Sequence, residues 1–144
     1  MLDFDAFDQW YEEDEALVGH PRDPYHRVDV RRSSRHVRIE RDGQVLAESS
    51  APALVFETNL PTRFYLPHQD VKVPLQPSDL RTHCAYKGEA RYWSVDGVDG
   101  GDDLVWEYEA PLPDAAGLQG FVAFYDDRVD VIVDGVPRER ARPF

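Results

Sequence analysis

The chain has 144 residues, a hydrophobic content of 42% and a formal net charge of −12 at pH 7. A chain of this size is most simply one domain with a substantial core, and its apolar runs are shorter than the roughly 18 residues that a membrane-spanning helix needs. The acidic balance disfavours binding to DNA or RNA polymers, because that binding depends on basic surfaces that neutralise phosphates.

Cysteine usage and the N-terminal composition indicate the compartment. Cys84 is the single cysteine, so an internal disulfide is excluded. Residues 1–15 are acidic and lack the basic start and apolar centre of a secretory signal peptide. We therefore expect a cytoplasmic protein without a membrane partner.

The first 25 residues are expected to form an acidic helical head and a connector. Aromatic residues recur there at helical spacing with acids on the other face, the pattern of a short amphipathic helix: Phe4, Phe7, Trp10 and Tyr11. Gly19, Pro21 and Pro24 then indicate an irregular connector. The helix would dock on the body or on a second copy of the chain, so a homodimer is one expectation.

Residues 26–136 carry short segments typical of β-strands and are expected to form a single β domain. Val37 and Ile39 alternate with charged residues, and Asp42-Gly43 is a strong hairpin turn signal. The pattern predicts strands over 35–41, 44–48, 53–57, 63–66, 71–73, 91–95, 104–108, 121–125 and 128–133, and at most a helical turn over 113–118. We predict a mainly β fold, either a small antiparallel sandwich or a partly open barrel, followed by a loose tail over 137–144.

The densest reactive chemistry lies in residues 81–93, which hold Cys84, His83 and Lys87 as candidate catalytic residues. A cysteine nucleophile acts as the thiolate, which a neighbouring cation favours, although a single cysteine is also typical of a small buried apolar residue. Histidine can act as a general acid or base near neutral pH, or bond to backbone beside a turn. Lys87, one of two lysines, would contact an anion, form a Schiff base or lie on the surface beside Gly88. Adjacent strand residues point to opposite faces, so His83 and Cys84 are not expected to pair, whereas Tyr86 would share the face of Cys84.

A second candidate group surrounds Pro61. Glu57 and Arg63 either form an ion pair that braces this turn or clamp a ligand, because Arg offers a planar fork to carboxylate or phosphate. Six aromatic residues lie in or near these segments. We expect most of them to pack in the core and a few to line a flat pocket for a ring: Tyr65, Tyr86, Tyr92, Trp93, Trp106 and Tyr108. We take Glu57, Arg63, Tyr65, Tyr86 and Trp93 as candidate ligand-binding residues. The five histidines are scattered and no C-x-x-C motif is present, so we expect no metal site and no cofactor.

Three segments carry a family resemblance: residues 56–67, residues 82–95, and residues 120–125 leading into 128–131. Together they resemble the bacterial domain of unknown function family numbered 427, sometimes labelled nucleotidyltransferase-like, over about residues 37–135. The resemblance implies a small, mostly β, cytoplasmic domain without an established reaction. Asn59 and Ala85 stand where the family pattern has glycine and proline, and Asn tolerates the left-handed backbone of such a turn.

The sequence leaves three functions open. The first, which we favour, is a domain that binds a small anionic metabolite at a pocket built from residues 56–65 and 82–88. The second is a nucleotidyltransferase-like or cysteine-dependent enzyme, although the chain lacks the G-x-x-x-x-G-K-[ST] phosphate loop. The third is a non-catalytic interaction protein that uses the acidic head.

Overall fold

The computed structural model describes residues 10–12, 15–17 and 26–139, and these residues form a mainly β structure. The strands are β1 (Trp10–Glu12), β2 (Glu15–Leu17), β3 (Val28–Arg32), β4 (Val37–Arg41), β5 (Gln44–Ser49), β6 (Ala53–Glu57), β7 (Arg63–Pro67), β8 (Leu75–Cys84), β9 (Gly88–Val95), β10 (Val105–Glu107), β11 (Phe121–Phe124), β12 (Asp130–Val133) and β13 (Val136–Pro137). Two short 3₁₀ helices, η2 (His68–Asp70) and η3 (Pro113–Leu118), interrupt them. None of the helices in these described ranges is long and apolar enough to cross a membrane.

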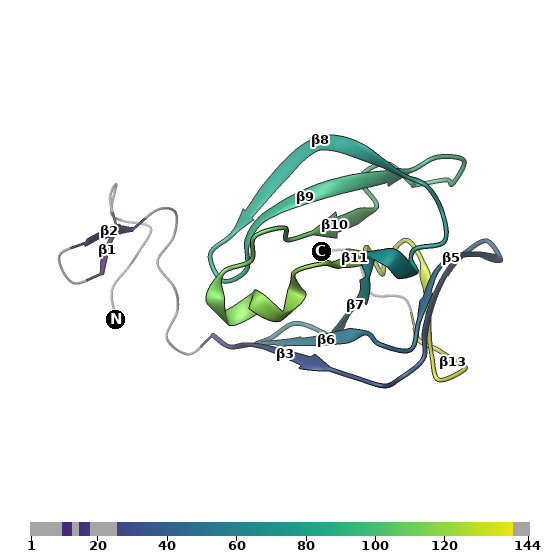
Figure 1. Cartoon of the computed structure of the whole chain (residues 1–144), viewed down its shortest axis with the longest axis horizontal. Helices are drawn as coiled ribbons and strands as arrows, with labels where there is room; N and C mark the ends of the chain where they lie inside the picture. Colours follow the sequence, from purple (N-terminus) through teal and green to yellow (C-terminus); the bar gives the residue numbers. More distant parts are fainter. Residues whose placement is uncertain (1–9, 13–14, 18–25, 140–144) are drawn as a thin grey trace.

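The larger sheet has seven antiparallel strands in the order β3-β6-β7-β11-β10-β9-β8. The sheet is strongly curled. In Figure 1, β8 and β9 run along the top, and β3 and β6 run along the bottom. The sheet does not close into a barrel within the described residues, since β3 and β8 each have one hydrogen-bonded neighbour in the strand order.

Helix η3 and the segment before it connect the two ends of this curled sheet. The backbone N–H of Leu112 donates to the carbonyl of Lys87, in the β8–β9 turn, at 3.0 Å. At the other end, Gly117 packs so closely on β3 that an added Cβ would lie 3.2 Å from Val30. Helix η3 therefore covers one part of the concave face of the sheet (Figure 1).

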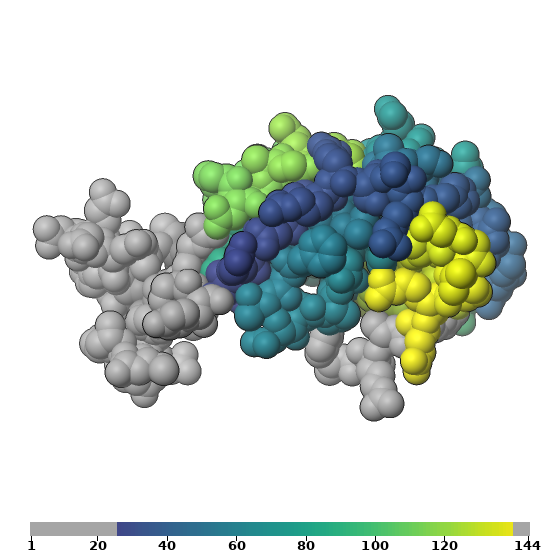
Figure 2. Space-filling model, turned by 90° about the horizontal axis from the view of Figure 1, so that it is seen from below, coloured from purple at the N-terminus to yellow at the C-terminus, as the bar shows by residue number. Residues whose placement is uncertain are grey.

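The smaller sheet has four strands in the order β13-β12-β4-β5 and packs on the convex side of the larger one. Apolar residues of β4, β5 and β12 meet those of β7, β10 and β11 in the first buried cluster, which includes Val37, Leu46, Leu66, Val105 and Val122. The described body is thus two packed antiparallel sheets, as in a sandwich, with Figure 2 showing the C-terminal segment (yellow) against one end of them.

A second buried cluster fills the concave side of the larger sheet. Alternate residues of the same strands supply it, because successive side chains of a strand point to opposite faces. Leu66 and Val105 belong to the first cluster, whereas their neighbours Tyr65 and Trp106 belong to the second. Strands β10 and β11 are consequently buried on both faces.

Several sequence predictions need correction. The expected N-terminal helix is not found where the head is described, because β1 and β2 pair there as antiparallel strands; the rest of the head lies outside the described residues. The expected strand over 71–73 is reduced to one isolated bridge between Val71 and Ala47. Strands β3 and β8 were not predicted. Both are edge strands with many exposed, charged or polar residues, and in β3 the apolar alternation is limited to Val28 and Val30.

Candidate functional site

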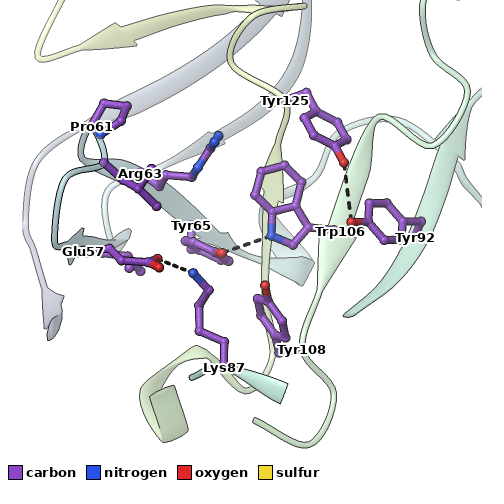
Figure 3. Close-up of a pocket in the computed structure, with 11 residues that line it drawn as sticks. Glu57, Pro61, Arg63, Tyr65, Lys87, Tyr92, Trp106, Tyr108 and Tyr125 are labelled. Carbon is purple, nitrogen blue, oxygen red and sulfur yellow. Dashed lines mark hydrogen bonds and ion pairs between the residues drawn. The ribbon is translucent and has the colours of Figure 1, made fainter. Parts of the chain in front are cut away.

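A cavity of about 200 Å³ opens on the concave side of the larger sheet (Figure 3). Its lining combines three charged side chains with a group of aromatic rings and three apolar residues. The charged residues are Glu57, Arg63 and Lys87. The aromatic residues are Tyr65, Tyr92, Trp106, Tyr108 and Tyr125, and the apolar residues are Val55, Leu60 and Pro61.

The Glu57 carboxylate is the most heavily contacted charge in this lining. One oxygen forms an ion pair with the Lys87 ammonium, and the other lies 3.0 Å from Nε2 of His26. The side chains of Glu57 and Lys87 are only 10% and 11% exposed. The pair therefore connects the end of β6 with the β8–β9 turn, and both of its side chains are largely shielded from solvent.

Arg63 presents a second positive charge from the start of β7. Its Nη1 donates to Asp126 Oδ1 at 3.0 Å, and its guanidinium carbon lies 5.2 Å from the centre of the Trp106 ring. A guanidinium carries five N–H donors, so this single bond to Asp126 leaves most of them available to a ligand.

The floor of the cavity is made of buried phenols and an indole. The Trp106 Nε1–H donates to the Tyr65 hydroxyl at 3.0 Å, which leaves the hydroxyl hydrogen of Tyr65 able to donate in turn (Figure 3). Tyr108 is 6% exposed, and its hydroxyl has no hydrogen-bond partner among the described residues. Burial raises the pKa of both Tyr65 and Tyr108, so both phenols stay neutral and can act as hydrogen-bond donors.

Two further tyrosines form the wall beside Trp106. The hydroxyls of Tyr125 and Tyr92 lie 3.4 Å apart, and the Tyr92 hydroxyl also lies 2.9 Å from Thr82 Oγ1. Burial, together with the hydrogen bond to Tyr92, raises the pKa of Tyr125 to about 12. This wall is therefore a hydrogen-bonded network that holds the rings in place.

Two turns with positive φ position the charged residues. Asn59, between β6 and β7, has φ +64°, so asparagine takes the left-handed conformation at this turn, as expected. Gly88 has φ +109°, and an added Cβ would lie 3.4 Å from the carbonyl oxygen of Ala110. The glycine after Lys87 thus permits both the turn and the close approach of residues 110–112.

The structure brings together four of the eight residues that the sequence singled out: Glu57, Arg63, Tyr65 and Lys87 all line the cavity. The ion pair considered between Glu57 and Arg63 is not formed, because each has another partner. The alternative of Lys87 as a surface lysine is also overturned by its burial.

The other four candidates lie outside this lining. His83 is exposed on β8, whereas its neighbour Cys84 is half-buried against the second core cluster, so the two side chains diverge as the strand alternation predicts. Tyr86 does not continue the face of Cys84, because the chain turns at residues 85–87 and the Tyr86 ring stacks on His26 at 4.1 Å. Trp93 donates to Glu107 at 2.6 Å and packs with the first core cluster.

Sequence reasoning missed several residues of the site. Tyr125, Leu60, Pro61 and Val55 line the cavity, and His26 and Asp126 hold its charged groups. The one available signal was strand alternation, since Tyr65 and the apolar Val55 each belong to the concave face of their strand. Within the described residues, no three His, Cys, Asp or Glu side chains gather in a way that could hold a metal ion.

Comparison with known proteins identifies the family. A family model described as a domain of unknown function, DUF427, matches residues 29–135. The chain belongs to this family. The matched range contains every residue that lines the cavity, from Val55 to Tyr125. A comparison with proteins of curated function gave no match.

Proposed function

We propose that this DUF427 domain binds a small carboxylate in the cavity, with the carboxylate at Arg63 and the apolar part of the ligand against Trp106. The observation that carries the proposal is the Tyr108 hydroxyl, which belongs to the cavity lining and has no hydrogen-bond partner among the described residues. A ligand or water that accepts its hydrogen bond is therefore favoured there.

The unused donors of Arg63 favour an anion. Arg63 and Lys87 are positive and Glu57 is negative in the lining, and Asp126, which is not part of the lining, takes one N–H of Arg63 and leaves the others for a ligand. The guanidinium of Arg63 matches the planar geometry of a carboxylate. The neutral phenols of Tyr65 and Tyr108 add hydrogen-bond donors, which suit an acceptor-rich ligand.

The size of the cavity favours a ligand with a single ring. A cavity of about 150 Å³ is known to hold benzene, and pockets for larger small molecules span roughly 300–1,000 Å³. The volume here is about 200 Å³. A whole nucleotide would not be enclosed, so carboxylate binding is favoured over the nucleotidyltransferase-like alternative. The cysteine-dependent alternative receives no support from the lining, because Cys84 is not part of it.

Calorimetric titration with para-toluate tests the proposal, because this probe carries one carboxylate on one apolar ring. We expect a Kd of about 1 mM or below for the wild-type protein. Arg63→Leu should weaken binding by about tenfold or more, since hydrogen bonds to charged groups contribute roughly 1.5–3 kcal/mol.

Arg31→Leu provides the matched control, because Arg31 is exposed on the edge strand β3 and is not part of the lining. It should bind para-toluate as the wild type does. If Arg63→Leu unfolds easily yet binds para-toluate with unchanged affinity, then Arg63 braces the structure through Asp126 and the proposal is wrong.

A further inference from the structure

The position of Lys87 assigns a covalent chemistry to the same cavity. We propose that Lys87 forms a Schiff base with small aldehydes or ketones that also carry a carboxylate. This inference rests on the proposed function, because the carboxylate contact at Arg63 holds the carbonyl group in the cavity. It differs from that function in requiring a reaction at the lysine nitrogen.

Three features of the lining supply what imine formation needs. The first is a primary amine that lines a largely aromatic cavity and whose side chain is 11% exposed, and lysine amines form Schiff bases with carbonyl substrates. The second is Glu57, whose carboxylate contacts the Lys87 ammonium and can accept its proton. The third is the Tyr108 hydroxyl, which points into the cavity in Figure 3 and is free to donate to a carbonyl oxygen.

The step balances with the groups present. Glu57 removes one proton from the Lys87 ammonium, and the amine lone pair forms a bond to the carbonyl carbon while the C=O π electrons move to oxygen. That oxygen takes a second proton from the same nitrogen and is stabilised by the Tyr108 hydroxyl. Glu57 then returns its proton to the hydroxyl group, water leaves, and the nitrogen lone pair forms the C=N bond of the iminium, which keeps the third proton.

The charged partners explain why this lysine, rather than Lys72, would react. Lys72 is exposed and does not line the cavity. It therefore has neither the desolvation nor the neighbouring Glu57 carboxylate. Because the chain has two lysines, Lys72 is an internal control for the intrinsic reactivity of a solvated lysine.

The test uses para-carboxybenzaldehyde with sodium cyanoborohydride, which reduces an iminium to a stable secondary amine. Peptide mass spectrometry then measures the added carboxybenzyl group at Lys87, at Lys72 and at the N-terminal amine. We expect modification of Lys87 to be at least about tenfold faster than that of Lys72, because the cavity holds the aldehyde beside the amine. Lys72→Arg should leave the Lys87 rate unchanged, and Lys87→Arg should remove the fast reaction.

Titration of the same preparation with para-toluate, which has no carbonyl group to condense, separates the two proposals. If para-toluate binds but Lys87 reacts no faster than Lys72, the Schiff base is excluded and carboxylate binding stands. If para-toluate does not bind and Lys87 shows no preference, both proposals fail. A Lys87 rate that para-toluate suppresses by competition supports both.

Discussion

The Glu57–Lys87 ion pair is expected to couple the end of β6 to the β8–β9 turn, and a double-mutant cycle measures that coupling. Both side chains are about nine-tenths buried, at 10% and 11% exposure. Breaking a buried pair from one side costs about 3–5 kcal/mol when the remaining charge is uncompensated. In Lys87→Met, however, Glu57 keeps His26 at 3.0 Å, so we expect a smaller loss of about 2 kcal/mol.

Glu57→Gln should cost a similar amount, since it leaves the Lys87 ammonium without its carboxylate. The double variant should lose less than the sum of the two, by a coupling free energy of about 1–2 kcal/mol. Urea unfolding followed by fluorescence measures each value. With a slope of roughly 2 kcal/mol/M, each single variant lowers the midpoint by about 1 M.

The exposed pair Arg27–Asp29 is the matched control. Its side chains are 75% and 34% exposed, and Arg27 Nη2 lies 3.4 Å from Asp29 Oδ2. An exposed pair contributes about 0–1 kcal/mol, so the cycle of Arg27→Met with Asp29→Asn should show little coupling. A Glu57–Lys87 coupling no larger than this control, below about 0.5 kcal/mol, would refute the reasoning, because independent sites add within that range.

Three further predictions concern the rest of the cavity. Tyr108→Phe should change stability by less than about 0.5 kcal/mol, because its hydroxyl has no partner among the described residues, yet weaken para-toluate binding about fivefold; a loss of stability with unchanged affinity contradicts this. Asp126→Asn should tighten para-toluate binding about threefold in calorimetry, because it removes the carboxylate that competes for Arg63, and weaker binding would show that Asp126 positions Arg63 instead. Finally, the pKa of Tyr125 is raised to about 12 from the ordinary value of about 10, so the stability associated with its neutral form is complete below pH 10 and is lost as the pH rises toward 12. Urea midpoints measured across that range should fall less steeply in Tyr125→Phe, and identical slopes would be evidence against the raised value.

Much of the sheet structure could be predicted from the sequence, because a strand that is buried on one face alternates apolar and polar residues along the chain. The alternation of Val37 and Ile39 is that of β4, and Val131 of β12 pairs with Ile39. Strand β8 could not be found in the same way, because it is a long edge strand whose side chains are mostly exposed. Strand β8 pairs with β9 through backbone hydrogen bonds, and these do not require any pattern of apolar side chains.

Four of the eight candidate residues line the cavity, and the other four do not, for a related reason. Glu57, Arg63 and Lys87 belong to specific motifs around turns, so the sequence alone indicated them as candidate site residues. Trp93 was chosen although its neighbour Tyr92 lines the cavity. Adjacent strand residues face opposite sides, and two aromatic residues in succession do not reveal which one faces the concave side.

The cluster of Cys84, His83 and Lys87 shows that closeness in sequence is a weak guide to a shared site. Two residues lie between Cys84 and Lys87, and within that distance β8 ends and the chain turns. Lys87 instead meets Glu57, which lies 30 residues earlier in the chain. Long-range contacts of this kind depend on the curl of the sheet, which no local pattern specifies.

The same ion pair links the fold to the proposed chemistry. Glu57 lies at the end of β6 and Lys87 in the turn that leads into β9, so their contact spans the cavity between two distant parts of the curled sheet. A ligand carboxylate that contacts Lys87 has to compete with Glu57, whereas the iminium of the proposed Schiff base keeps its positive charge and can stay paired with Glu57. The coupling free energy from the double-mutant cycle is therefore the interaction that a carboxylate at Lys87 would have to offset and that an iminium retains. A large value would favour a ligand that places its carboxylate at Arg63 and its carbonyl group at Lys87.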